Sequence, residues 1–390
     1  MTIVRLVRGI QARGGTVTRL QSSCGGLVSP AACDNPIGYK WSWSPRGALT
    51  AMNNGAVWLE GGERKAIEPG QGRLLGAATP YALPGMPAYA LEQLPNRESL
   101  SYATRYGVEG PRLVSFMRGT LRYAGFGEAM GLLAAAGVLA GSPTPLPPSL
   151  SVPVGGGTGS GAAGGAGPFS TPLRVFLAAC AGLESPMDTT PAALAQALCS
   201  ARLRAVAQPA GGGGAAGSAP PPSPRQLKKA LDFLHWVGLE APVTVTPVPA
   251  SPASPASPAS AAGGACCHFV PVDALLTVLA GHPGMQLLGS QADLVLMSHE
   301  IEAEFSGGEV ETHTSTLVLS GGVLRGHSAM AATVGYTAAV GAGILLGEHH
   351  GGVVPSVKGV VTPEASVWAE PILQALEEEG VCFKEAVRRH

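Results

Sequence analysis

Three tracts of low-complexity sequence divide this chain of 390 residues and limit which of its segments can fold. They cover residues 141–167, 208–224 and 246–264, and they consist mostly of Gly, Pro, Ala and Ser, with glycine runs and a Ser-Pro-Ala repeat. Such a composition offers too little apolar surface to offset the entropy lost on ordering. We therefore expect three structureless insertions, and a folded protein built from the segments between them.

The charge balance argues against a nucleic-acid binder. Twenty-five Lys and Arg residues oppose 26 Asp and Glu residues, which gives a formal net charge of −1, and 13% of the residues are charged. A nucleic-acid-binding protein usually carries a basic excess or a basic stripe, and this sequence has neither. We expect no nucleic-acid partner.

Cysteine usage and the N-terminal residues favour a cytoplasmic protein. The seven cysteines are an odd number without the spacing of a disulfide framework, and residues 1–8 contain no long apolar run that would resemble a secretory signal. The most membrane-like stretch, residues 329–347, is rich in Ala and Gly and lacks flanking basic or aromatic anchors. We expect a buried core helix there, and no membrane partner.

Two short motifs look functional but have simpler interpretations. The glycine run at 155–161 lies inside a low-complexity tract with no strand before it, so it does not predict a nucleotide-binding loop. The adjacent Cys266, Cys267 and His268 lack the spacing of zinc ligands. We expect no metal site.

Hydrophobic periodicity predicts a mixed α/β protein with a helical middle third. The expected helices cover 121–139, a segment that starts at 171–172, 226–237 and 363–379. Residues 294–305 and 309–319 show partial alternation around Ser306-Gly307-Gly308, which predicts a β-hairpin.

Four arginines near the end of the first third need a chemical reason in a chain so poor in charge. Arg97, Arg105, Arg118 and Arg122 fall within 26 positions. Arginine suits carboxylate ligands because its planar fork grips a carboxylate through two parallel hydrogen bonds. The same arginines could instead be structural, paired with Glu98 or capping carbonyl groups. The residue types alone leave both interpretations open.

Several long motifs occur together in one order: SSCGGLVSP, DNPIGYKWSWSPRG, LPNRESLSY, RGTLRYAGFGEAM, ADLVLMSHEIE and MAATVGYTAAVGAGILL. Through them the sequence resembles saccharopine dehydrogenase of the glutamate-forming type. The resemblance covers roughly residues 10–141 and 271–390, whereas the middle third departs from the family because the low-complexity tracts interrupt it.

The resemblance implies an α/β (α+β) fold, with a mixed sheet and helices similar to the C-terminal domain of glyceraldehyde-3-phosphate dehydrogenase. Residues 1–117 and 282–390 would form the two parts of a substrate-binding and dimerisation domain. Residues 118–281 would form an inserted helical subdomain that carries the low-complexity loops. A homodimer is implied as well.

The resemblance also implies a reaction, the oxidation of saccharopine by NAD or NADP to glutamate and 2-aminoadipate 6-semialdehyde, or the reverse. Its implied saccharopine contacts are Arg97, Thr120, Leu121 and Arg122. Ser42, Trp43 and Ser44 would lie near the nicotinamide, and Cys24 would lie near the reacting centre, unless it is simply a packed small residue. The general base is not identified.

The family's N-terminal Rossmann domain has no counterpart among these motifs. We therefore expect that no nicotinamide cofactor binds this chain alone, and that a separate Rossmann domain is a possible partner. The ligand would be saccharopine or a related amino dicarboxylate. The alternative is a non-catalytic saccharopine-binding or dimerisation module without a nucleotide site.

Overall fold

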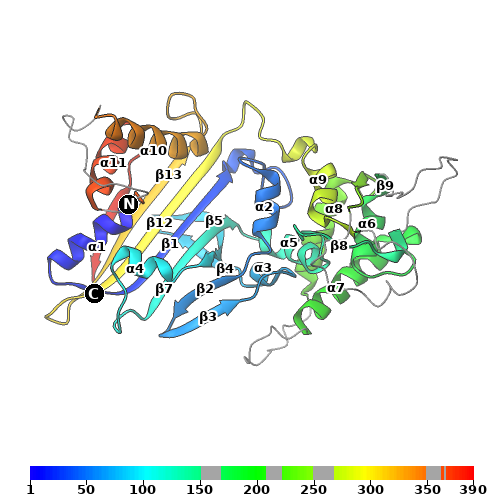
Figure 1. Cartoon of the computed structure of the whole chain (residues 1–390), viewed down its shortest axis with the longest axis horizontal. Helices are drawn as coiled ribbons and strands as arrows, with labels where there is room; N and C mark the ends of the chain where they lie inside the picture. Colours follow the sequence, from blue (N-terminus) through cyan, green and yellow to red (C-terminus); the bar gives the residue numbers. More distant parts are fainter. Residues whose placement is uncertain (151–167, 208–221, 249–267, 348–361, 364–365) are drawn as a thin grey trace.

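The structure is a computed structural model that describes residues 1–150, 168–207, 222–248, 268–347, 362–363 and 366–390 (Figure 1). Its main feature is one large mixed sheet with the strand order β14-β13-β12-β1-β7-β2-β3. At its centre, β1 (Thr16–Val28) pairs antiparallel with β12 (Asp293–Glu304) and parallel with β7 (Ser115–Tyr123). The two ends of the sequence therefore build one sheet, and the expected mixed α/β fold is confirmed.

The remaining strands of the sheet extend it on both sides. They are β2 (Ala56–Glu60), β3 (Glu63–Ile67), β4 (Thr79–Leu83), β5 (Met86–Pro95), β6 (Arg97–Glu98), β13 (Val310–Ser320) and β14 (Lys384–Arg389). The predicted hairpin is confirmed, because β12 and β13 pair in register from Leu294–Ser320 to Glu304–Val310. The outermost strands, β3 and β14, carry mostly charged and exposed residues.

Helices cover one side of the sheet, which we call the helical face. They are α1 (Thr2–Ala12), α4 (Ser101–Tyr106), α10 (Ala329–Leu345) and α11 (Ser366–Glu378). Leu20, Phe116 and Ile301 project from this face into one apolar cluster with α1 and α4. Because side chains alternate along a strand, their sequence neighbours point to the opposite side, which we call the open face.

The open face is covered at one end only. There Leu27, Leu121 and Leu296 pack with Leu83 and Leu91 of the β4–β5 hairpin. Further along, Arg19 and Gln21 of β1 stand on the same face, and no described helix lies over them. Within the described ranges, the sheet is therefore layered against helices on one side and partly uncovered on the other.

The helical subdomain lies at the far end of the sheet and contains the largest apolar cluster, which includes Phe126, Phe176 and Phe233 (Figure 1). Its helices, with the short ones that join it to the sheet, are α2 (Pro45–Ala51), α3 (Arg73–Gly76), α5 (Phe126–Ala135), α6 (Leu173–Cys180), α7 (Pro191–Ala207), α8 (Pro224–Val237) and α9 (Pro271–Leu279). Two small sheets join β8 (Thr144–Pro145) to β11 (His268–Phe269) and β9 (Phe169–Pro172) to β10 (Pro242–Val245).

The helix expected over 121–139 is wrong at its beginning. Residues 115–123 form β7, and α5 begins only at Phe126, after Gly125 has turned the chain in the left-handed region at φ +97°. The buried carboxylate of Glu92 accepts hydrogen bonds from the backbone N–H groups of Gly125 (2.9 Å) and Gly127 (2.6 Å). This contact between distant segments fixes the helix start and is invisible to local periodicity. The boundary expected at 117/118 consequently falls inside β7.

The first low-complexity tract is not structureless throughout. Thr144 and Pro145 form β8, which pairs with β11, and Leu150 is buried in the core of the helical subdomain. The expectation therefore fails for residues 144–150. Residues 151–167 of that tract lie outside the described residues, as do most of the other two tracts, the glycine run at 155–161 and the pair Cys266-Cys267.

Helix α10 is less buried than we expected. Ala329, Ala332 and Ile344 face the core, but Val334 and Leu345 are 62% and 60% exposed. Its outer side is thus an apolar surface. Within the described ranges, no helix combines the length and the hydropathy that a membrane span requires.

Candidate functional site

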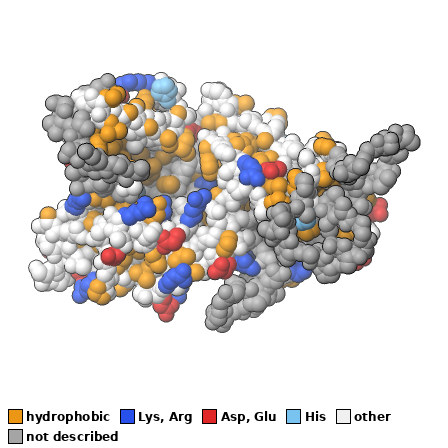
Figure 2. Space-filling view, viewed as in Figure 1, with side chains coloured by type: hydrophobic (Ala, Val, Ile, Leu, Met, Phe, Trp, Pro, Cys, Tyr) orange, Lys and Arg blue, Asp and Glu red, His pale blue; other side chains and the backbone are white. Residues whose placement is uncertain are grey.

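A cavity of about 340 Å³ opens on the helical face where β7 meets α2 and α4. Its wall includes Trp43, Arg97, Tyr102, Arg118, Thr120 and Arg122. No Asp or Glu is among the described residues that line it. Three guanidinium groups thus share one cavity in a chain whose charges nearly cancel. Elsewhere on the sheet-bearing part of the molecule, Lys and Arg are interspersed with Asp and Glu (Figure 2).

The alternation of β7 explains why these side chains converge. Arg118, Thr120 and Arg122 are two residues apart and therefore share the helical face. Leu121 points to the open face, where it is fully buried against Leu27. Its carbonyl oxygen accepts a hydrogen bond of 2.8 Å from Nη1 of Arg122. Any contact of Leu121 with a ligand in the cavity would therefore involve its backbone.

Arg122 is the most enclosed of the three arginines. It is 9% exposed, and its guanidinium carbon lies 5.3 Å from the ring centroid of Tyr39 and 5.5 Å from that of Phe126. Its Nε–H has no hydrogen-bond partner among the described residues. A buried donor left unpaired costs about 1–3 kcal/mol, more when it is charged. The arrangement is suited to an anionic acceptor.

Arg97 adopts a strained backbone conformation at the edge of the same cavity. Its φ is +52°, in the left-handed region that non-glycine residues rarely occupy, and such strain is often found at ligand-binding positions. The conformation is held by backbone pairing of Arg97 with Ala56 and by a 2.8 Å hydrogen bond from the N–H of Asn96 to the carbonyl of Arg118. The structure records no ion pair for the Arg97 side chain within the described residues.

Cys24 is brought to the arginines by the parallel pairing of β1 with β7, which sets it beside Thr120. Its side chain reaches solvent, yet it sits deep enough among the strands for desolvation to raise the pKa of the thiol. The guanidinium groups of Arg122 and, more weakly, Arg118 lower this pKa but do not reverse the shift. Desolvation therefore favours the neutral thiol of Cys24 over the thiolate.

The Ser42–Ser44 segment places only its middle residue in the cavity. The indole of Trp43 is 45% exposed and donates a 3.1 Å hydrogen bond to the hydroxyl of Tyr39. Ser44 caps α2 by accepting a 3.2 Å hydrogen bond from the N–H of Gly47. The Ser42 hydroxyl is buried and has no partner among the residues that the structure describes.

The contacts implied by the resemblance include neither Arg118 nor Tyr102, although both line the cavity. Arg118 had been singled out only as one of four arginines that could bind a carboxylate or be structural. The available signal was the two-residue spacing of Arg118, Thr120 and Arg122, which marks one face of a strand. The helix expected from residue 121 onwards concealed this spacing.

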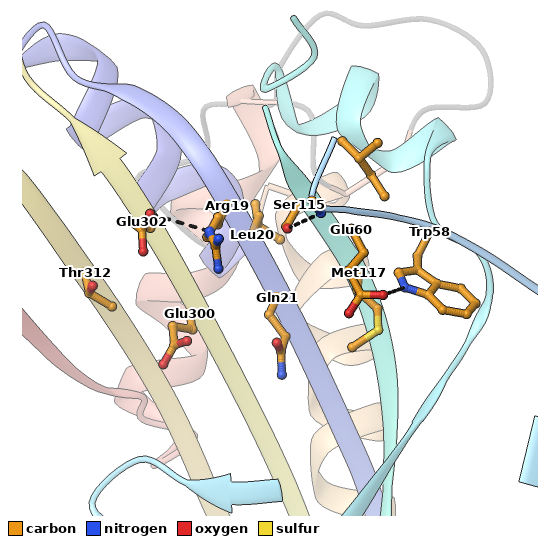
Figure 3. A pocket seen from close by; sticks show the side chains of 12 residues that line it. Arg19, Leu20, Gln21, Trp58, Glu60, Ser115, Met117, Glu300, Glu302 and Thr312 are labelled. Atoms are coloured by element: carbon orange, nitrogen blue, oxygen red, sulfur yellow. Dashed lines mark hydrogen bonds and ion pairs between the residues drawn. The ribbon is translucent and has the colours of Figure 1, made fainter. Parts of the chain in front are cut away.

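A second hollow, of about 370 Å³, lies on the open face of the sheet (Figure 3). Arg19 and Gln21 of β1, Glu300 and Glu302 of β12 and Thr312 of β13 stand side by side across its floor. Nε of Arg19 lies 3.7 Å from Oε1 of Glu302, so part of the charge in this hollow is paired. Among the described residues there is no cluster of three His, Cys, Asp or Glu side chains that could hold a metal ion.

Comparison with known proteins identifies relatives over nearly the whole chain. Residues 1–381 match the family model described as "Saccharopine dehydrogenase C-terminal domain". The chain is 28% identical over 387 residues to "Saccharopine dehydrogenase [NADP(+), L-glutamate-forming]" of Pyricularia oryzae. This alignment covers 98% of this chain and 70% of that protein. The chain is also 29% identical over 392 residues to "Alpha-aminoadipic semialdehyde synthase" of Arabidopsis thaliana. That alignment covers 99% of this chain and 31% of that protein.

A solved structure supports the same relationship. The apo histidine-tagged saccharopine dehydrogenase (L-Glu forming) from Saccharomyces cerevisiae matches with a TM-score of 0.68 and 27% sequence identity. The match covers 99% of this chain and 70% of that chain.

The proximity of Cys24 to the arginines predicts the pH dependence of its alkylation. Because only the thiolate reacts with iodoacetamide, the midpoint of Cys24 labelling should lie above the 9.0 of an unperturbed thiol. Arg122→Gln should raise the midpoint further, since it removes the largest favourable charge. Peptide mass spectrometry would measure the rate at each pH, with Arg112→Gln as a control. An unchanged midpoint in Arg122→Gln would show that the two groups do not interact.

Proposed function

Because the chain belongs to the saccharopine dehydrogenase C-terminal domain family, we propose that it is the substrate-binding part of a saccharopine dehydrogenase of lysine metabolism. The ligand of the arginine-lined cavity is then saccharopine or a related amino dicarboxylate. One observation carries this proposal: three guanidinium groups converge without a carboxylate among the described lining residues. Saccharopine has three carboxylates and a primary amine, which suits such a site.

In this proposal the arginines bind and orient the substrate. Arg122 offers the edge of its guanidinium that lines the cavity to one carboxylate, and Arg97 grips another at the edge of the cavity. The Thr120 hydroxyl lies between the two β7 arginines and is free to donate to a ligand oxygen. The exposed indole of Trp43 forms a flat wall that limits water around the bound substrate.

When bound, NAD or NADP supplies the hydride acceptor for oxidation of the secondary amine, and hydrolysis of the resulting imine gives glutamate and 2-aminoadipate 6-semialdehyde. Among the residues that the structure describes, those around the cavity suit one end of that cofactor. The exposed indole of Trp43, which lines the cavity, suits the nicotinamide end, whereas the buried Ser42 hydroxyl does not reach it.

The pyrophosphate end of the cofactor fits less well. Helix N-termini commonly hold phosphates, but the carboxylates of Glu92 and Asp293 already accept the N–H groups at the starts of α5 and α10. This supports a separate Rossmann domain as the holder of the rest of the cofactor.

The outer side of α10 is a suitable contact surface for such a domain. The helix has no charged residue from Ala329 to Leu345, and Val334, Ala338 and Leu345 line an apolar groove of about 480 Å³ beside α11. Apolar surface of this kind usually marks an interface.

The open face of the sheet supports a homodimer. The floor near β1 and β12 carries Glu300 and Glu302, whereas the floor near β14 carries Lys384 and Arg388. Two copies related by a two-fold axis would bring the acidic end of one face over the basic end of the other.

A non-catalytic module remains the second candidate, and one observation favours it. The described residues that line the cavity include no Asp, Glu, His, Lys or Cys, so none of them is an obvious general base. A saccharopine-binding or dimerisation module would need only the arginines.

The binding proposal predicts a specific pattern of affinities. The chain should bind saccharopine weakly in isothermal titration, and Arg97→Gln or Arg122→Gln should weaken binding at least about thirtyfold, roughly 2 kcal/mol, because each removes a charge-assisted pair. Arg112→Gln is a matched control, since this exposed arginine pairs with Glu304 away from the cavity. Binding that ignores both cavity substitutions would refute the assignment.

A fusion that supplies a cofactor-binding domain distinguishes the enzyme from the non-catalytic module. The chain alone should show no saccharopine oxidation. A fusion with a relative's NADP-binding domain placed ahead of Met1 should turn over, and Arg122→Ala should reduce its kcat/KM at least about thirtyfold. Oxidation by the unfused chain would contradict this proposal, and a folded fusion that binds saccharopine and NADP but never turns over would favour the module.

The dimer proposal predicts a concentration-dependent mass. Light scattering at micromolar concentration should report a homodimer, and Glu300→Arg on the open face should shift the population toward monomer by placing like charges together. Glu184→Arg, on the exposed surface of the helical subdomain, is the control. A monomeric parent chain would count against the interface.

A further inference from the structure

The guanidinium of Arg118 stacks more closely on an aromatic ring than that of Arg122 does. Its guanidinium carbon lies 3.7 Å from the ring centroid of Tyr102, and both side chains line the cavity. Arg105 approaches the same ring at 4.9 Å. A guanidinium stacked on an aromatic face is attracted by the ring's negative quadrupole, while its in-plane N–H groups stay available for a ligand.

The backbone of Arg118 also fixes the position of Arg97. The carbonyl of Arg118 accepts a 2.8 Å hydrogen bond from the N–H of Asn96, and its own N–H donates to the Ser99 hydroxyl at 3.1 Å. These two bonds clamp the turn that carries Arg97 in its left-handed conformation. The two arginines therefore keep a constant spacing, which a rigid binding site requires.

The guanidinium of Arg118 forms no ion pair with a carboxylate of the described residues. Glu98 is close enough for this charge to help lower its pKa, against the opposing effect of burial. Its carboxylate oxygens, however, accept the backbone N–H groups of Leu100 (2.6 Å) and Ser101 (3.0 Å) at the start of α4. Within the part of the chain that the structure describes, the Arg118 side chain forms no ion pair or hydrogen bond.

These contacts bring a third guanidinium into the cavity beside Arg97 and Arg122. Building on the saccharopine-binding function proposed above, we infer that Arg118, stacked on Tyr102, binds the third carboxylate of the substrate. The stack makes Arg118 a specificity residue: it favours an amino acid with three carboxylates over one with two. Arg97 and Arg122 would bind either kind of ligand.

The inference is tested by comparing two ligands on the full chain. Isothermal titration would give the affinities for saccharopine, which has three carboxylates, and for 2-aminoadipate, which has two. Arg118→Gln should weaken saccharopine binding at least about tenfold and change 2-aminoadipate binding less than about twofold, because only the larger ligand reaches Arg118. The ratio of the two affinities is the readout.

Substitutions of the stacking ring separate a structural effect from a binding effect. Tyr102→Phe keeps the aromatic face and should preserve the affinity ratio, whereas Tyr102→Leu removes the face and should shift the ratio in the direction of Arg118→Gln. Arg105→Gln alters the other guanidinium on that ring and should leave the ratio unchanged. Circular dichroism melts would confirm that each variant is folded.

The possible results distinguish this inference from the proposed function. If Arg122→Gln weakens saccharopine binding but Arg118→Gln leaves the ratio unchanged, the third contact is wrong and the binding function stands. If Arg118→Gln weakens both ligands equally, Arg118 contributes only general attraction and the specificity role is overturned. If the parent chain binds neither ligand at millimolar concentration, both the function and this inference fail.

Discussion

The parallel pairing of β1 with β7 is the contact on which the rest of the structure depends. It joins the N-terminal strand to a strand about a hundred residues later, and β12 then closes on the other side of β1. The register sets Ser22 beside Arg118 and Cys24 beside Thr120. A slip of one residue in β7 would turn the arginines to the open face and bring Leu121 into the cavity. Sheet register and binding chemistry are therefore determined together.

Two buried carboxylates connect this sheet to its helices. Glu92 of β5 accepts two N–H groups at the start of α5, and Asp293 of β12 accepts two at the start of α10, at 2.7 and 2.8 Å. Each satisfies donors that a helix start leaves unpaired and is favoured by the helix dipole. Burial nevertheless raises the pKa of Glu92, so desolvation outweighs the two hydrogen bonds there. These carboxylates fix where the helical subdomain and α10 begin.

Local patterns in the sequence predicted only what local interactions determine. The β12–β13 hairpin followed from alternation around a glycine turn, and α8 followed from its apolar spacing. The β7–α5 junction could not be predicted, because the carboxylate that ends one element and starts the next comes from Glu92. Averaged composition likewise concealed Leu150 within a proline-rich tract. For the site, residue types left the role of the arginines open, and the family resemblance singled out Arg97 and Arg122. The structure brings these two into one cavity, while their contact with saccharopine stays a prediction.

The charged edge strands have a consequence for how copies of this chain can meet. An open sheet exposes a row of unsatisfied backbone groups along each border, and such borders tend to recruit further strands into fibres. Here one border carries Glu63, Arg64 and Lys65, and the other is the fully exposed strand Lys384–Arg389. Repulsion and hydration at these side chains oppose lateral growth. These edge charges do not oppose association through the open face, so the sheet favours small closed oligomers over fibres.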